Sequence, residues 1–320
     1  MHLKLSKSGK KFFFITLCTE RREKTLSRIN DDATIALMPA GEAIVNEWRA
    51  QHAKNAALTA SNFVIMPDHA HLLLIVDYNK SPDFDIIDWI HNFTATTASG
   101  DSGAGASGDS GAGASGGSGA LPRPVALRWE PQFWLVLSFD SRQLSAIRRY
   151  IKLNPARALW KLRNPDRFIR RANIRHAVLD ETRQWDALGD LTLIASPFLF
   201  PVRLTRKKTV EEHKAEIDKI IAKARHGAIP VSGFISPGEK EVLRRLKAEP
   251  LARFIKTLPH ALPQRYDPSA EDSRELAAGR MLILSGFPQT VQHNGSIARS
   301  NCLLMNDLIT AMCTRAATLK

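Results

Sequence analysis

Short apolar runs and segments of helical spacing alternate along the first 195 residues. The runs that suit strands are residues 11–19, 58–66, 69–76 and 125–134, and the segments that suit helices are residues 31–53, 85–96 and 140–160. Asp31 or Asp32 would cap the first of these helices. The order of the elements predicts an α+β domain over residues 1–195, with an antiparallel sheet and the ferredoxin-like split βαβ topology.

A different pattern begins near residue 196. Helical segments at residues 205–225, from 236, at 271–279 and at 297–318 alternate with strand-like runs at residues 229–235, 251–258 and 281–284. This alternation predicts a small C-terminal α/β domain over residues 196–320. The helix that starts at Ser236 offers backbone N–H groups to a phosphate, or forms an ordinary strand-to-helix connection, since no glycine-rich phosphate-binding pattern is present.

Residues 98–120 consist only of Gly, Ala, Ser and Asp, and the octet SGDSGAGA occurs there twice. Such a segment has no side chain large enough to build a packed core, which is typical of a flexible linker. It falls between the second helix and the fourth strand of one predicted unit. We therefore expect an insertion inside the N-terminal domain whose ends lie close together, because loop closure costs little more as a loop lengthens.

Charge narrows the class of partner. The 320 residues include 45 Lys and Arg against 32 Asp and Glu, a net charge of +13, and 44% are hydrophobic. The apolar content excludes an acidic disordered protein, and the positive charge favours nucleic acid as a partner. Residues 121–183 hold 14 basic and 5 acidic side chains, so we expect the anion-binding surface there.

The cysteines and the hydropathy indicate a compartment. Cys18, Cys302 and Cys313 are too few and too scattered for a disulfide framework or a cysteine zinc site, which favours a reducing cytoplasm. No apolar run approaches the roughly 18 residues of a membrane span, so no membrane association is expected. Four histidines stand isolated in the C-terminal region and are expected at the surface: His213, His226, His260 and His293.

Two histidines share one face of the third predicted strand. Side chains alternate along a strand, so His69 and His71 project from the same face about 7 Å apart. Pro67 and Asp68 fit a tight turn just before them. Two imidazoles in this arrangement can converge on a metal ion, although a third ligand is needed. The alternative is a pair of partly exposed histidines that are hydrogen-bonded locally at a hairpin.

A tyrosine lies in the middle of the most basic predicted helix, which Asp140 or Ser141 would cap. Tyr150 and Asn154 are four residues apart and share a face. Four cations surround the phenol: Arg148, Arg149, Lys152 and Arg157. Nearby cations favour a phenolate and would hold a phosphodiester beside it. An amide oxygen of Asn154 suits Mg²⁺ or Mn²⁺. The alternative is a structural helix with a solvated basic face, which Pro155 breaks or kinks.

Taken together, these segments resemble the single-tyrosine HUH transposases, and in particular the REP-associated tyrosine transposases of bacteria. That family carries a "(M/L)P(N/D/E)HxH" strand, a "WQ…FW" segment and a "YIxxNPxxA" helix. The corresponding segments here are Met66 to His71, Trp129 to Trp134 and Tyr150 to Ala158, in the same order and at similar spacing. The match covers roughly residues 8–185. Leu135, Val136 and Leu137 depart from it, since members usually carry polar or charged residues there.

The resemblance implies a chemistry for these residues. His69, His71 and Asn154 would bind Mg²⁺ or Mn²⁺, and Tyr150 would attack the scissile phosphate of single-stranded or hairpin DNA. The product would be a 5′-phosphotyrosine link and a free 3′-hydroxyl, and resealing would reverse the step without ATP. Basic residues would track the DNA backbone: Arg148, Arg149, Lys152 and Arg157.

Several questions stay open from the sequence. A domesticated, non-catalytic nucleic-acid-binding protein of the same fold and a metal-dependent hydrolase of small phosphate esters are the alternatives. A homodimer is open as well, because Tyr150 can serve its own subunit or a partner. Residues 279–284 and 297–303 bear a fainter resemblance to Rossmann-like domains related to the DNA-processing protein A group, and the role of that region is not defined.

Overall fold

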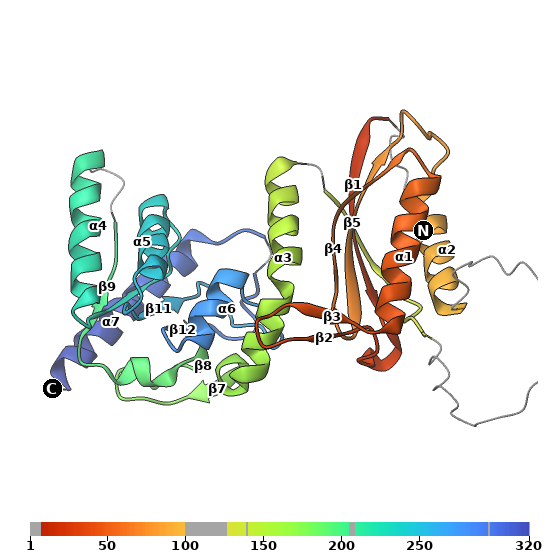
Figure 1. Ribbon diagram of the computed structural model, residues 1–320. Coiled ribbons are helices and arrows are strands. Elements are labelled where there is room, and N and C mark those ends of the chain that lie inside the picture. Colours follow the sequence, from red (N-terminus) through yellow and green to blue (C-terminus); the bar gives the residue numbers. More distant parts are fainter. Residues whose placement is uncertain (1–7, 100–126, 139, 205–208, 294, 320) are drawn as a thin grey trace, which may run out of the picture. The chain divides into compact units, whose positions relative to one another are not determined.

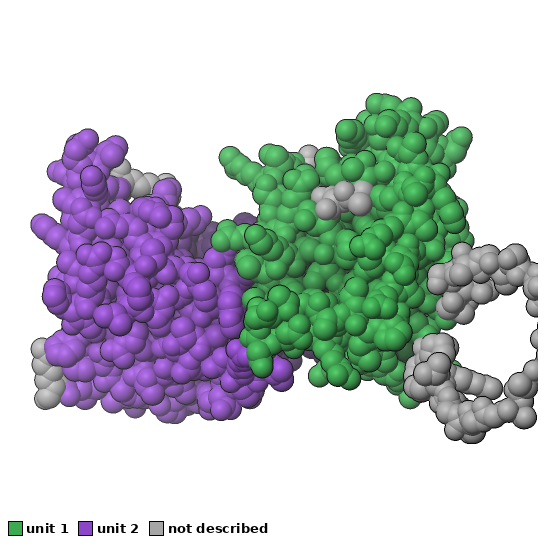
Figure 2. All heavy atoms as spheres, viewed as in Figure 1, with its two compact units in different colours: residues 1–159 green, residues 160–320 purple. Residues whose placement is uncertain are grey.

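The computed structural model describes residues 8–99, 127–138, 140–204, 209–293 and 295–319. The chain forms two compact units, residues 1–159 (unit 1) and residues 160–320 (unit 2), which Figure 2 colours separately. Each unit has its own sheet. None of the helices within the described ranges is long and apolar enough to cross a membrane.

Unit 1 is built on an antiparallel sheet (Figure 1). Its elements are β1 (Lys10–Cys18), the short 3-10 helix η1 (Glu20–Arg22), β2 (Ser27–Ile29), β3 (Ile35–Leu37), α1 (Pro39–Lys54), β4 (Leu58–Ile65), β5 (His69–Asp77), α2 (Ile86–Ser99), β6 (Trp134–Ser138) and α3 (Ser141–Arg163). The strand order is β4-β5-β1-β6, and every neighbouring pair is antiparallel. The predicted α+β class with an antiparallel sheet is confirmed.

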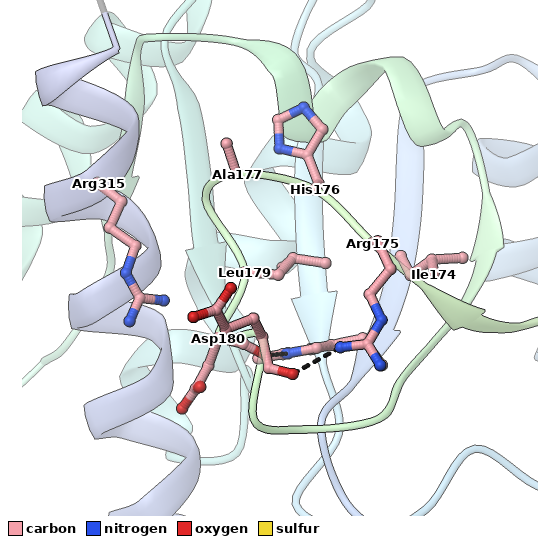
Figure 3. A pocket seen from close by; sticks show the side chains of 9 residues that line it. Ile174, Arg175, His176, Ala177, Leu179, Asp180 and Arg315 are labelled. Atoms are coloured by element: carbon pink, nitrogen blue, oxygen red, sulfur yellow. Dashed lines mark hydrogen bonds between the residues drawn. The ribbon is translucent and has the colours of Figure 1, made fainter.

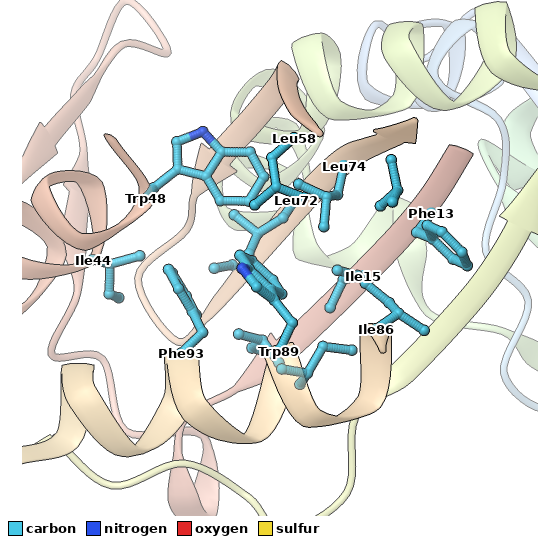
Figure 4. Close-up of a cluster of buried hydrophobic side chains, with 14 of the residues drawn as sticks. Phe13, Ile15, Ile44, Trp48, Leu58, Leu72, Leu74, Ile86, Trp89 and Phe93 are labelled. Carbon is cyan, nitrogen blue, oxygen red and sulfur yellow. The ribbon is translucent and has the colours of Figure 1, made fainter. Parts of the chain in front are cut away.

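The two faces of this sheet are covered differently. Alternate residues of the central strands, such as Phe13, Ile15 and Leu72, enter a large apolar core with α1 and α2 (Figure 4). The other face carries a smaller cluster in which Ile151 of α3 packs with Val64, Met66 and Leu73. His69 and His71 follow the alternation of β5 onto this second face, because Ala70 and Leu72 on either side of His71 point into the core.

Two predicted elements of unit 1 are wrong in extent. The helix predicted for residues 31–53 begins only at Pro39, because residues 35–37 pair with β2 as a strand. Asp32 caps no helix; it accepts hydrogen bonds from the backbone N–H and the hydroxyl of Thr34 in a turn, at 2.9 and 2.6 Å. The strand predicted for residues 125–134 begins where that range ends, at Trp134, and runs to Ser138.

The flanks of the predicted linker lie close together. Most of residues 98–120 fall outside the described residues, but Ala98 and Ser99 belong to α2. On either side of the gap, the indole Nε1 of Trp129 donates a hydrogen bond to Thr97 Oγ1 at 2.9 Å. Leu127 and α2 enter the same core. The chain therefore leaves and re-enters one unit, as an insertion inside a domain requires.

Unit 2 contains a six-stranded sheet in the order β7-β8-β12-β11-β10-β9. Its elements are the 3-10 helix η2 (Pro165–Phe168), β7 (Arg171–Ile174), β8 (Trp185–Gly189), the 3-10 helix η3 (Leu191–Ala195), β9 (Leu199–Pro201), α4 (Val210–Arg225), β10 (Ile229–Ser232), α5 (Pro237–Ala248), β11 (Phe254–Thr257), α6 (Ala270–Ala277), β12 (Met281–Ser285) and α7 (Arg299–Thr318). Strands β9 to β12 are parallel, whereas β8 and β7 are antiparallel additions.

Both faces of the second sheet are buried. Leu282 and Leu284 of β12 pack with α7, and Met281 and Ile283 pack on the opposite face with α4, α5 and α6. Burial on both sides is what a sheet of mostly parallel strands requires. Cys313 lies buried in the α7 cluster, as expected, while Cys302 near the start of the same helix is only half-buried.

The division between the units differs from the predicted boundary at residue 195. Sequence reasoning did not identify β7, β8 or β9, which are short. Strand β8 pairs with β12, and Trp185 in β8 is buried in the core against α7. Residues 171–189 therefore belong to the sheet of unit 2, and the division falls between Leu159 and Trp160, inside α3.

Candidate functional site

The two histidines of β5 converge on the face that carries α3. The ring centroids of His69 and His71 are 4.7 Å apart, in an edge-to-face arrangement. The tight turn at Pro67 and Asp68 is held in place by Thr19, whose backbone N–H and hydroxyl both donate to the carbonyl of Asp68. The placement of both histidines on one face, predicted from strand alternation, is confirmed.

The environment of His71 leaves one ring nitrogen available. Its Nδ1 lies 2.8 Å from Thr16 Oγ1 on β1, while its Nε2 is buried without a hydrogen-bond partner in the described part of the chain. Burial, reinforced by the charges of His69, Arg22 and Arg157, lowers the pKa of His71 to about 3. The imidazole is therefore neutral at neutral pH, and a neutral imidazole is the form that binds a metal ion.

Asp68 orients the first histidine. Its Oδ1 lies 2.6 Å from His69 Nδ1, and its Oδ2 lies 3.4 Å from Arg22 Nη1. Burial acts to raise the pKa of Asp68, but the hydrogen bond and charge of His69, with Arg22, outweigh it and hold the pKa below the ordinary value. A carboxylate on one ring nitrogen fixes the imidazole and leaves the other nitrogen for a ligand.

Tyr150 of α3 meets the histidine pair. Its ring centroid lies 5.1 Å from that of His71 and 5.9 Å from that of Phe14 on β1, edge-to-face in both cases. The guanidinium carbon of Arg157, two helical turns further along α3, lies 5.0 Å from the centroid of the Tyr150 ring. The fold thus brings Tyr150 to two histidines that precede it by about eighty residues in the sequence.

The other predicted residues of α3 lie at different depths. Asn154 is buried one turn beyond Tyr150, and α3 continues through Pro155 to Arg163 rather than breaking there. Arg148, Arg149 and Lys152 are exposed, whereas Arg157 is buried over the tyrosine. Asp140 caps the helix, because its Oδ1 accepts from the backbone N–H of Gln143 at 2.7 Å.

The metal-ligand set stays a prediction. Within the described residues, no three His, Cys, Asp or Glu side chains gather in a way that would hold a metal ion. The histidine pair would therefore need a ligand of another kind, which is the role predicted for Asn154. The buried and unpartnered Nε2 of His71 is the feature of the site that a cation would satisfy.

The sequence analysis did not predict three residues of this site. Two are Phe14 and Thr16 of β1, and the third is Asp68, whose contact with His69 was not foreseen. Asp68 was assigned only to the turn, although an acid directly before the first histidine is a readable signal. Thr16 and Phe14 carry no such signal. They reach the site only because β1 pairs with β5 in a register that sets Thr16 opposite His71.

Unit 2 holds a separate hollow of about 600 Å³ (Figure 3). Its walls come from the segment around residues 174–185 and from Arg315 of α7. Arg175 Nη1 donates to the carbonyl of Glu181 at 2.6 Å, and Trp185 Nε1 donates to that of Asp180 at 3.0 Å. These bonds close the segment on itself, and the hollow contains none of the residues predicted to be functional.

Two other sequence predictions for unit 2 concern the start of α5 and the histidines. The start of α5 has the capping box of an ordinary strand-to-helix connection: Glu239 Oε2 accepts from the backbone N–H groups of Ile235 and Ser236, and Ser236 Oγ accepts from that of Glu239. His260 and His293 are not isolated, since their ring centroids lie 4.9 Å apart.

Comparisons with known proteins place few constraints on the chain. No family model and no curated protein match it. Among solved structures, DNA processing protein A from Helicobacter pylori, described as having a unique single-stranded DNA binding mode, is similar at 23% identity over 46% of this chain and 67% of that one, with a TM-score of 0.35.

Two structures of transposases are also similar. A REP-associated tyrosine transposase bound to a REP hairpin has 15% identity over 49% of this chain and 73% of its own, with a TM-score of 0.30. A candidate transposase from Deinococcus radiodurans R1 has 16% identity over 48% of this chain and 96% of its own, with a TM-score of 0.27. Likenesses at this level do not assign the chain to a family.

Proposed function

We propose that this protein is a metal-dependent single-strand DNA endonuclease and strand transferase, acting in DNA transposition or recombination. The observation that carries the proposal is the convergence of His69, His71 and Tyr150 on one face of the sheet. The β4-β5-β1-β6 strand order supports it, because a ferredoxin-like split βαβ unit places its strands in this order.

His69 and His71, with Asn154, would hold Mg²⁺ or Mn²⁺. The fit rests on the Nε2 of His71, which has no hydrogen-bond partner among the described residues. It also rests on the two Nδ1 atoms, because Thr16 contacts that of His71 and Asp68 contacts that of His69. When bound, the ion would supply Lewis-acid polarisation of a phosphate oxygen. The protein's own part is to keep His71 neutral and both imidazoles oriented before the ion arrives.

Tyr150 would be the nucleophile. Its phenol oxygen would form a bond to the phosphorus of the scissile phosphodiester while the bond from phosphorus to the 3′ oxygen breaks. The proton lost by the phenol balances the proton gained by the departing 3′-hydroxyl, and the reverse step with another 3′-hydroxyl reseals the strand. Arg157, over the tyrosine ring, would place a positive charge beside the anionic phosphate.

The proposed partner is single-stranded or hairpin DNA. The exposed side chains of Arg148, Arg149 and Lys152 lie within one turn of Tyr150 on α3 and would contact the phosphate backbone. Unit 2, with four parallel strands and helices on both faces, is proposed to be a Rossmann-like domain. Its role within this function is left open.

A covalent-adduct assay tests the proposal. The full chain is incubated with labelled hairpin and single-stranded DNA in Mg²⁺ or Mn²⁺, and denaturing gels reveal any protein–DNA band that survives. We expect a metal-dependent adduct in the native protein, complete loss of it in Tyr150→Phe, and retention in the control Tyr78→Phe, because Tyr78 lies in the α1–α2 core.

The other outcomes identify the alternatives. An adduct that persists in Tyr150→Phe would show that another residue is the nucleophile. Salt-sensitive DNA binding without an adduct would favour a non-catalytic nucleic-acid-binding protein. Turnover of small phosphate esters without a DNA adduct would favour a hydrolase built on the same histidine pair.

A further inference from the structure

An exposed tryptophan lies on the same sheet face as the candidate site. Strand β6 pairs with β1 so that Trp134 stands opposite Thr16, and Thr16 stands opposite His71 on β5. Residues directly opposite in an antiparallel sheet share a face, so Trp134, Thr16 and His71 form a row across three strands. Neighbouring strands are about 4.8 Å apart, so the backbone of Trp134 lies roughly 10 Å from that of His71, measured across the sheet.

The rest of β6 shows that this exposure follows the strand's own alternation. Leu135 and Leu137 point to the opposite face and pack against the α1–α2 core. Trp134 is 60% exposed and Val136 is 42% exposed, and Val136 lies opposite Phe14 of the site. On this face, Ile151 of α3 packs near β4 and β5, toward the edge of the sheet that is opposite to β6. The exposed apolar side chains of β6, Trp134 and Val136, belong to none of the buried clusters of the described residues.

We propose that Trp134 is a stacking platform for an unpaired base of the DNA strand whose phosphate lies at Tyr150; this rests on the proposed function. An indole offers a flat apolar face on which any base can stack, and such platforms beside basic surfaces are the means by which proteins bind single strands without reading sequence. The backbones of Trp134 and His71 are two strand spacings apart, roughly 10 Å, so a strand with its phosphate at the histidine pair would set a neighbouring base beside the indole.

The charge of the region favours this occupant over a second protein surface. From Trp134 to the end of unit 1 at Leu159, the sequence has five basic side chains and one acidic side chain, Asp140. The exposed cations of α3, such as Arg148, Arg149 and Lys152, repel a second copy of the same surface but attract a polyanion. A base on Trp134 and a backbone held by these cations form one consistent path for a single strand.

Binding without chemistry tests the platform. Fluorescence anisotropy of the full chain, in a chelator that removes divalent metal, compares a short labelled oligothymidylate with an abasic strand of the same length. Stacking on an aromatic residue is worth enough that Trp134→Ala should weaken oligothymidylate binding roughly 5- to 150-fold. Trp134→Phe should retain most of the affinity for oligothymidylate. The native protein and Trp134→Ala should bind the abasic strand with the same affinity.

Phe198 provides a matched control. It is 57% exposed in unit 2, so Phe198→Ala removes a similar exposed aromatic surface and should leave binding to both strands unchanged. The preference for the strand with bases is the decisive readout, because a general loss of structure in Trp134→Ala would weaken binding to both strands equally.

The outcomes separate this inference from the proposed function. If Trp134→Ala binds oligothymidylate as tightly as the native protein, the platform is wrong even where the Tyr150 adduct forms. If the base preference is lost in Trp134→Ala but no adduct ever forms, the platform stands and the catalytic proposal fails. Dissociation of a dimer in Trp134→Ala, with binding unchanged, would show that edge strand β6 is an interface between copies and would overturn the inference.

Discussion

The four-stranded sheet of unit 1 and the six-stranded sheet of unit 2 bury their faces to different degrees. The sheet of unit 2 is covered on both sides, by α7 on one and by α4, α5 and α6 on the other. The sheet of unit 1 has one face in a large apolar core and a second face on which histidines, a threonine and an exposed tryptophan lie among apolar residues. A face that packing leaves partly open has room for side chains that serve a substrate.

One buried polar residue from each unit shows a related difference. In unit 2, Asp272 is buried against Lys247 and Lys256, with oxygen-to-nitrogen distances of 2.5 and 2.9 Å, so its charge is matched within the fold. In unit 1, His71 is equally buried but keeps one ring nitrogen without a partner. The matched charges of Asp272 are explained by stability, whereas the unmatched nitrogen of His71 needs another explanation, and the metal ion proposed above is one.

The largest effect should come from breaking the matched cluster. Asp272→Ala leaves Lys247 and Lys256 without their carboxylate, and removing one partner of a buried ion pair costs about 3–5 kcal/mol. Hydrogen exchange of the β12 amides measures the loss in unit 2. The control Asp218→Ala removes an exposed partner of Arg245 and should cost at most about 1 kcal/mol. Equal costs for the two substitutions would contradict the structural role given to Asp272.

A smaller effect, on activity, should follow from loosening the histidine pair. Thr16→Val keeps the side-chain shape but removes the hydroxyl 2.8 Å from His71 Nδ1. Loss of such an orienting partner lowers metal affinity or activity roughly 10- to 100-fold. The rate of adduct formation at a series of Mn²⁺ concentrations measures it. Thr16→Ser should restore the rate, and a Thr16→Val protein as active as the native one would remove Thr16 from the site.

The smallest effect is a pH dependence of unit 2. Burial acts to raise the pKa of Asp272, but the charges of Lys256 and Lys247 outweigh burial and hold this pKa below its ordinary value of 3.8. The unfolded chain therefore binds this proton first as pH falls, and stability declines from the ordinary aspartate pKa down through the lowered one. The slope from one proton is at most about 1.4 kcal/mol per pH unit.

The substitution Asp272→Asn separates the contribution of Asp272 to the pH dependence of stability from the contributions of the other carboxylates. It removes the titrating group but keeps a hydrogen-bonding side chain. Unfolding followed in denaturant from neutral pH to about pH 2 should show a shallower acid decline in the variant. An identical decline in both proteins would mean that Asp272 carries no linked proton.

Prediction from sequence succeeded where local patterns determine local structure. The alternation in β5 placed both histidines on one face, and the Ser236 and Pro237 signal located the start of α5. It failed at short strands, since β2, β3, β7, β8 and β9 owe their extended form to pairing with partners rather than to their own composition. The boundary at residue 195 failed for the same reason, because β8 pairs with β12 nearly a hundred residues later.

The sequence by itself determined the chemical groups of the site and the face on which His69 and His71 lie, because alternation along a strand is a local property of the backbone. Only the tertiary structure decided what surrounds them. The register of β1 against β5 and β6 brought Thr16 to His71 and aligned Trp134 with both, and the packing of α3 set Tyr150 and Arg157 beside the pair. Register and packing depend on contacts between distant segments, which no local pattern encodes.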